Sequence, residues 1–329
     1  MEAKTTTKTR ARIGFVLRLV PLCFLAVVLW RERPWAVRVS PNAPWAVTLT
    51  ILINLAVFLP IKAARWRLAL VAPPPFGQVL AATVEGLLAN AAIGFGSGDL
   101  VRAARLRPQR GQLAVDYACT WAERGAEMLA FGLLVFVAAL TTRLGTLALG
   151  FSGLLVGGYA ALLTGGRFLV PRLGRWPRVQ GALAAGLAAS TPRRVAAMAL
   201  LSLGGWAVEI VMLALFQSAF HLPVSLATSV LTLIGINAAI AIPTLPGNFG
   251  TFEAGVVMAL VMCGAPRDVA VSYALAYHLT HVIPVAVVAT AVYLVRSRGH
   301  FHSEPPAMSP EGRSPPALDA MDPDQGSRR

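Results

Sequence analysis

The chain has 329 residues, of which 56% are hydrophobic and only 13% are charged, whereas soluble domains carry about 25% charged residues. Apolar windows recur along the chain and no polar stretch approaches domain length, which excludes a soluble catalytic domain. The net charge of +14 does not indicate nucleic acid as a partner, because the arginines lie in short loops between apolar windows, as positive-inside topology requires.

The windows predict an all-α, polytopic membrane protein with about eight transmembrane helices. The expected spans are 13–30, 43–61, 114–142, 144–166, 195–221, 224–243, 252–265 and 269–295. Residues 1–12 form a basic N-terminal segment, and residues 13–298 form the transmembrane domain. The tail 299–329 is rich in Pro, Ser and charge, so we expect it to be disordered.

The stretch 78–95 decides the topology. If it crosses the membrane, the arginine-rich loop after it and the loop 167–194 both lie outside. If it enters and returns on the same side, both loops are cytoplasmic. The Lys/Arg bias favours this second arrangement, a re-entrant segment with both termini in the cytoplasm. We therefore expect a multi-pass protein of the cytoplasmic membrane.

A second interruption lies further along the chain. The run Pro223–Phe252 is uncharged and about thirty residues long, yet it contains Pro243, Pro246, Gly247 and Gly250. These residues break helices, and exposed backbone cannot face lipid. Such a break is tolerated where protein or a water-filled cavity surrounds it, as in the substrate sites of transporters. The segment therefore indicates more than a membrane anchor.

The chain also repeats itself. Asn90–Ile93 has the same sequence as Asn237–Ile240, and Ala114–Ala118 resembles Ala270–Ala274 in the same order. These matches predict an internal duplication, parallel or inverted, with two interrupted or re-entrant segments. The repeat elements lie near 78–142 and 224–295.

Charged residues follow the first break. Asp99, Arg102 and Arg105 come directly after the glycine-rich segment Gly94–Gly98. A helix that begins there, with Ser97 as its cap, offers free N–H groups and two arginines, a combination that suits a phosphate. The alternative is a solvated, positive-inside amphipathic segment.

The next span carries a polar stripe. Asp116, Thr120, Glu123 and Glu127 share one helical face, and Arg124 lies three residues before Glu127. Ionisable side chains at mid-bilayer cost roughly 2.5–3.5 kcal/mol on insertion scales, so they face a cavity or a partner. Both readings stay open: a cavity lining, or ion pairs that tie helices together. Asp116 is near the membrane edge, where we expect it to be solvated.

The second break is followed by Glu253, which either caps the helix that begins near Thr251 or faces a cavity. In the last span His278 and His281 share a face, which favours hydrogen-bonded packing or a proton-sensitive lining. Glu209 is an isolated acid without an evident partner. No metal site, cofactor motif or catalytic motif is present, so the pattern predicts neither an enzyme nor a cofactor.

These motifs resemble a known family, the transmembrane region of bacterial lysylphosphatidylglycerol synthases and their stand-alone, flippase-like relatives. The resemblance covers about residues 13–298. It rests on Glu85…Asn90…Gly98-Asp99…Arg102, on Ala122-Glu123-Arg124, and on Pro243-x-x-Pro246-Gly247-x-x-Gly250-x-x-Glu253. The soluble aminoacyl-transfer domain of the synthases is not in this sequence, so aminoacylation is not implied. The resemblance implies movement or handling of an anionic or amphiphilic lipid, or of a lipid-linked sugar.

We expect the two broken segments to face each other across a polar cavity, with membrane lipids as partners and no catalytic or metal-binding residues. The predicted substrate-binding residues are Asn90, Asp99, Arg102, Arg105, Glu123, Arg124, Asn237, Pro246, Gly247, Gly250, Glu253, His278 and His281. Two alternatives remain. The first is an accessory subunit or membrane-embedded enzyme of glycolipid or isoprenoid-lipid synthesis, with a lipid-biosynthesis enzyme as partner. The second is a structural scaffold. The sequence leaves the oligomeric state open.

Overall fold

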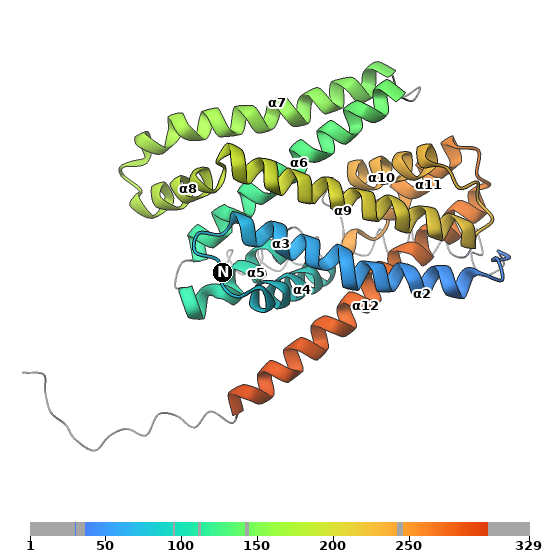
Figure 1. The fold of residues 1–329 in the computed structure, drawn as a ribbon, viewed down its shortest axis with the longest axis horizontal. Coiled ribbons are helices and arrows are strands. Elements are labelled where there is room, and N and C mark those ends of the chain that lie inside the picture. Colours follow the sequence, from blue (N-terminus) through green and yellow to red (C-terminus); the bar gives the residue numbers. More distant parts are fainter. Residues whose placement is uncertain are drawn as a thin grey trace, which may run out of the picture.

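The computed structural model describes residues 30, 37–94, 96–110, 113–141, 145–241 and 246–301. All regular structure in these residues is helical, which confirms the all-α prediction. The segment 1–12, most of the expected span 13–30 and the end of the tail lie outside the described residues. Figure 1 shows long helices packed side by side, with α12 running diagonally away from the others.

The first described helix is interrupted by a wider turn. Helix α2 (Ala43–Ile53), the π-helical turn η2 (Asn54–Phe58) and α3 (Leu59–Ala69) follow one another without a break. Pro60 explains the wider turn, because a proline cannot donate to the carbonyl four residues earlier and its ring clashes with that carbonyl. The N–H of Leu59 instead bonds the carbonyl of Asn54, five residues back. This helix runs beside α9 (Pro192–Ala219), which crosses the centre of the molecule.

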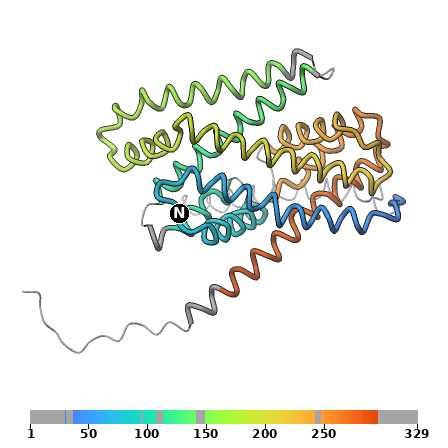
Figure 2. Tube along the Cα trace, viewed as in Figure 1, coloured from blue at the N-terminus to red at the C-terminus, as the bar shows by residue number. Residues whose placement is uncertain are grey.

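Two helical hairpins occupy the places of the predicted breaks. The first joins α4 (Phe76–Ile93) to α5 (Ser97–Arg110), and the second joins α10 (Leu226–Ile240) to α11 (Thr251–Met262) through the short turn η4 (Pro246–Asn248). Figure 2 shows the first hairpin below α3 and the second at the opposite end of the molecule. Helix α5 returns alongside α4, as a hairpin requires, while the re-entrant topology of this segment in the membrane stays a prediction.

Glycines allow both hairpins to close tightly. A Cβ atom on Gly86 would lie 2.7 Å from the carbonyl oxygen of Gly98, and one on Gly235 would lie 2.5 Å from that of Gly255. Close backbone approach through small residues is a common way for helices to pack in membranes. Gly86 lies four residues before Asn90, whereas Gly235 lies two residues before Asn237, so the hairpins are similar in construction without being superimposable residue by residue.

The remaining helices connect and extend the hairpins. They are α6 (Leu113–Thr141), α7 (Gly145–Leu169), η3 (Val170–Leu173), α8 (Pro177–Ala189) and α12 (Arg267–Phe301). Helix α8 corrects the expectation of a simple loop over 167–194. Its alanine- and leucine-rich sequence favours a helix, and Pro177 at the first helical position starts it. Helix α12 continues through Pro284, and it ends a few residues beyond the expected boundary at residue 298.

Five of the described helices are long and apolar enough to cross a membrane. They are Ala43–Ala69, Phe76–Ile93, Leu149–Leu173, Pro192–Ala219 and Arg267–Val295. Helix α6 matches the expected span 114–142 but carries four ionisable side chains, while α10 and α11 are shorter apolar helices. The count of eight spans therefore remains a prediction.

Candidate functional site

A network of buried ion pairs lies where α3, α5 and α6 meet. Arg65 of α3 contacts Glu123 and Glu127 of α6 at 2.9 Å each, and it donates to the hydroxyl of Ser202 in α9 at 3.1 Å. Glu123 has no exposed surface. The side chain of Arg65 is thus held from two sides, by carboxylates of α6 and by a hydroxyl of α9.

Helix α5 supplies the second half of this network. Arg102 contacts Glu123 at 2.5 Å and Asp99 at 3.0 Å. Arg124 of α6 contacts Asp99 at 3.0 Å and Glu127 at 2.8 Å. Burial alone would raise the pKa of Asp99, but Arg124 and Arg102 more than offset this effect and hold the pKa below its ordinary value.

We call these six residues, Arg65, Asp99, Arg102, Glu123, Arg124 and Glu127, the arginine–carboxylate network. They form a closed chain of contacts, and three guanidinium groups balance three carboxylates. Asp99 and Arg124 are partly exposed and the other four are buried; an opposite charge in contact offsets the cost of burying each of these four.

Trp66 and the polar stripe of α6 support the network. The indole N–H of Trp66 donates to Thr120 at 3.1 Å, and the guanidinium of Arg102 lies 4.8 Å from the centre of the Trp66 ring. Residues 116, 120, 123 and 127 are all buried, so the predicted stripe faces the protein interior. Asp116 has no exposed surface, which corrects the expectation that it is solvated, because α6 is packed among other helices.

A pocket opens beside the network. It surrounds about 390 Å³ of space, part of which is open solvent, and network residues share its lining with Lys62, Asn90 and Gly98. The second hairpin reaches this region from the other side, since a Cβ on Gly247 would lie 3.1 Å from the carbonyl oxygen of Ala91. Gly247 has φ +67°, a conformation that favours glycine. The tips of the two hairpins therefore meet next to the pocket.

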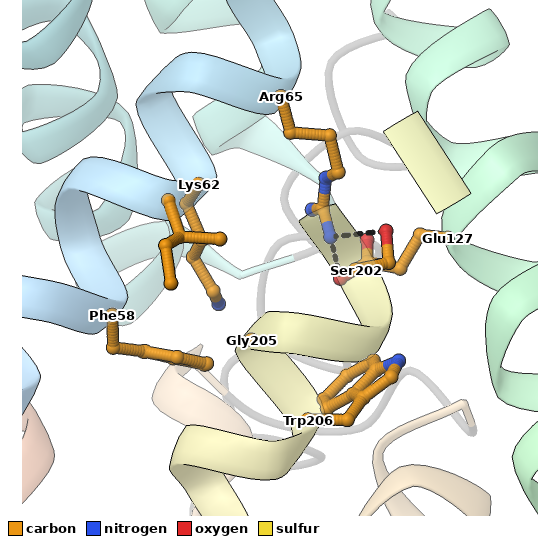
Figure 3. Close-up of a pocket in the computed structure, with 8 residues that line it drawn as sticks. Phe58, Lys62, Arg65, Glu127, Ser202, Gly205 and Trp206 are labelled. Carbon is orange, nitrogen blue, oxygen red and sulfur yellow. Dashed lines mark hydrogen bonds and ion pairs between the residues drawn. The ribbon is translucent and has the colours of Figure 1, made fainter. Parts of the chain in front are cut away.

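A smaller pocket lies on the other side of Arg65, between α3 and α9 (Figure 3). It is open to solvent, and its enclosed part has room for about one water molecule. Phe58, Ile61 and Trp206 give it apolar walls, and Lys62, Arg65 and Glu127 give it charge. Lys62 and Arg65 line both pockets.

The second hairpin carries a different polar pair. Glu253 accepts from the N–H of Gly250 at 2.6 Å and contacts Nδ1 of His278 in α12 at 2.7 Å. Phe252 stacks on the imidazole with ring centres 4.3 Å apart, and Phe249 lies 4.6 Å from it. The N-cap of α11 is thus Gly250, with φ +88°, and Glu253 bonds its N–H from the third position of the helix.

The isolated acid Glu209 has partners on α12. The hydroxyl of Tyr277 donates to it at 2.8 Å, and Nε2 of His281 lies 3.6 Å from it. Nδ1 of His281 is 3.0 Å from the carbonyl oxygen of Tyr277. Glu209 is buried within α9, so these contacts offset the cost of placing a carboxylate there.

Replacing Tyr277 by phenylalanine is expected to lower the free energy of unfolding by about 1.5 kcal/mol, because a hydrogen bond to a buried carboxylate is lost. Thermal unfolding of the purified protein in detergent measures the change. Tyr293→Phe is the matched control, since Tyr293 lies in the same helix and is exposed. Equal unfolding temperatures for the two variants would contradict the assignment of this bond.

The structure brings one group of predicted residues together at the larger pocket and leaves others apart. Its lining includes Asn90, Asp99, Arg102, Glu123 and Arg124. The other predicted residues make contacts away from this lining. Arg105 pairs with Glu85, and Asn237 donates to the carbonyl of Leu233 in its own helix. Glu253 pairs with His278, and His281 approaches Glu209. Pro246 begins η4, next to Gly247.

Sequence reasoning missed Lys62 and Arg65 as site residues, because it assigned both to the positive side of the membrane. Their spacing of three residues places them on one helical face, and their position directly after the expected span 43–61 was the available signal. No group of three or more His, Cys, Asp or Glu side chains within the described ranges is placed to hold a metal ion.

Comparisons with known proteins agree with the motifs. Residues 8–289 match the family described as the lysylphosphatidylglycerol synthase TM region. Searches of curated proteins and of solved structures each found no significant match. The matched segment contains the whole arginine–carboxylate network and both hairpins. The chain therefore belongs to the lysylphosphatidylglycerol synthase transmembrane family, and it is a multi-pass membrane protein of lipid metabolism or transport.

Proposed function

We propose that the protein moves an anionic or amphiphilic lipid, or a lipid-linked substrate, across the cytoplasmic membrane. The observation that carries this proposal is the position of the larger pocket. It lies beside a buried charged network, at the place where the tips of two interrupted hairpins meet. In transporters, discontinuous helices bring polar backbone and charge to such a site.

The chemistry of the site suits a headgroup with both signs of charge or with phosphate. Arg124 is the most accessible cation of the network, with 42% of its side chain exposed. Asp99 and Glu127 hold its guanidinium in place. A phosphate that enters the pocket would compete with these carboxylates for Arg124. A cationic headgroup would instead compete with Arg124 for the carboxylates of Asp99 and Glu127.

Movement of a hairpin is part of this proposal. In the present conformation every arginine of the network is paired, and the pocket is narrow between α4, α5 and α6. Separation of the α4–α5 hairpin from α6 would break the contacts of Arg102 and Arg124 across that boundary. These contacts would then be available to a headgroup, and their reformation would release it.

The test is translocation of headgroup-labelled phosphatidylglycerol in proteoliposomes that contain the full chain. We expect transport above the rate of protein-free vesicles, and at least a tenfold lower rate for Arg124→Gln. Arg193→Gln is the control, because Arg193 is exposed at the start of α9 and lies outside both pockets. Labelled phosphatidylcholine measures the preference for an anionic lipid.

Two outcomes would contradict the proposal. One is a wild-type rate no higher than that of empty vesicles, and the other is equal transport by wild type and Arg124→Gln. Lipid binding without translocation would instead favour an accessory role beside a lipid-biosynthesis enzyme.

A further inference from the structure

Lys62 differs from the other cations at the site because it has no ion pair in the described part of the chain. Its ammonium lies 4.6 Å from the centre of the Phe58 ring. Glu127 and Glu209 are within electrostatic range, but Glu127 already contacts Arg65 and Arg124, and Glu209 is held by α12. The arginine–carboxylate network is balanced without Lys62, and the charge of this lysine is balanced only at longer range, by Glu209.

The choice of residue at this position is unusual for this chain. The sequence has 29 lysines and arginines together, and the only lysines are Lys4, Lys8 and Lys62. An ammonium is a compact point charge that can bind a phosphate without the planar, two-pronged geometry of a guanidinium. Lysine at position 62 therefore indicates a small cationic contact rather than another bidentate ion pair.

The backbone places Lys62 at the boundary of both pockets. It follows the π-helical turn η2 by one helical turn, and such turns are frequent at functional sites. Figure 3 shows the lysine side chain reaching from α3 toward α9, on the same side as Phe58. Gly205 of α9 faces the same part of α3, since a Cβ there would lie 3.6 Å from Ile61 and 3.7 Å from Phe58.

The walls of the smaller pocket define the ligand further. Phe58, Ile61 and Trp206 are apolar or aromatic, and the indole N–H of Trp206 is buried without a hydrogen-bond acceptor among the described residues. Lys62 is half-buried, and a buried donor such as the Trp206 N–H is costly when left without a partner. An anionic oxygen at this place would satisfy the ammonium, and apolar groups of the same ligand would contact the walls.

We infer that Lys62 binds the phosphate of a phosphodiester or phosphomonoester ligand in the pocket between α3 and α9, as a contact distinct from the paired arginines. This inference rests on the proposed function, because it names the phosphate contact of the transported lipid. The same chemistry is offered by a lipid headgroup and by a free phosphate ester, and the apolar walls favour the lipid.

The experiment measures binding of phosphatidylglycerol to the purified full chain in detergent by native mass spectrometry, with phosphatidylcholine and free glycerol phosphate as separate arms. Lys62→Met is expected to weaken phosphatidylglycerol binding at least tenfold, and Lys62→Arg is expected to restore most of it. Arg67→Met is the matched control, because Arg67 lies in the same helix and its side chain bonds the carbonyl of Pro74 instead of lining a pocket.

Each outcome decides between sources or overturns the inference. Competition by glycerol phosphate would identify a free phosphate ester as a sufficient ligand, whereas binding of phosphatidylglycerol alone would identify the lipid. Equal phosphatidylglycerol binding by wild type and Lys62→Met would overturn the role of Lys62, and so would equal losses in Lys62→Met and Arg67→Met. Transport that still depends on Arg124 would in those cases leave the proposed function standing.

Discussion

Replacing Glu123 by glutamine is expected to lower the free energy of unfolding by about 3–5 kcal/mol, because the loss of one partner leaves an uncompensated charge in the protein interior. Glu123 has no exposed surface and contacts both Arg65 and Arg102. In the variant, three guanidinium groups share two carboxylates. Unfolding in mixed micelles, followed by circular dichroism, measures the effect, and we expect transport to be lost as well.

Asp268→Asn makes the same chemical change at an exposed position at the start of α12. It should change the free energy of unfolding by less than about 0.5 kcal/mol, as surface substitutions usually do. A Glu123→Gln protein as stable as Asp268→Asn would show that the network does not hold α3, α5 and α6 together.

The second large effect is expected at a glycine crossing. A Cβ atom on Gly255 would lie 2.3 Å from the carbonyl oxygen of Gly235 and 2.8 Å from the Cβ of Ala239. Gly255→Ala must therefore push α10 and α11 apart, at a cost near the upper end of the ~1–3 kcal/mol range for overpacking. The midpoint of thermal unfolding in detergent should fall accordingly.

Gly204→Ala provides the opposite case. Gly204 is also inside a long helix, but nothing lies within 4 Å of a Cβ placed there. Alanine should therefore stabilise α9 by about 0.5–1 kcal/mol through its higher helix propensity. The argument from close packing fails if both substitutions shift the midpoint in the same direction.

Most of the helix boundaries could be predicted from the sequence, because long apolar windows have no other stable form in a membrane. The exceptions have local causes. Residues 177–189 were read as part of a loop because the flanking arginines outweighed a short alanine-rich stretch. The helix also continues past the expected boundary at residue 61, as far as Ala69. The π-helical turn before Pro60 accommodates the proline within the helix, and the apolar pattern does not indicate such a turn.

The site was harder to predict, because its contacts join residues far apart in the chain. The polar stripe of α6 was readable from its spacing, but its partner Arg65 is 58 positions away from Glu123. Glu209 likewise contacts Tyr277 across 68 positions. Helical periodicity identifies which side chains share a face, but it cannot say which helix that face meets.

The two readings of the polar stripe of α6, a cavity lining and helix-tying ion pairs, both describe part of the structure. Glu123 ties α6 to α5 through the buried Arg102. Arg124 also pairs with acids, yet it remains partly open to the pocket. An ion pair that closes a pocket can serve both purposes, since the same contacts hold the helices together and are exchanged when a ligand enters.

The π-helical turn at Asn54–Phe58 also limits how this protein can change over time. Such a turn contains one residue more than regular α-helix needs, so losing one amino acid there would leave the helix intact. Because the extra residue is absorbed within the turn, the positions after such a deletion would keep their orientation, and Lys62 and Arg65 would still face the site. A deletion between Phe58 and Lys62, in regular α-helix, would instead rotate Lys62 by about 100° about the helix axis. Homologues that keep the site are therefore expected to tolerate the loss of one residue within the turn but not after it.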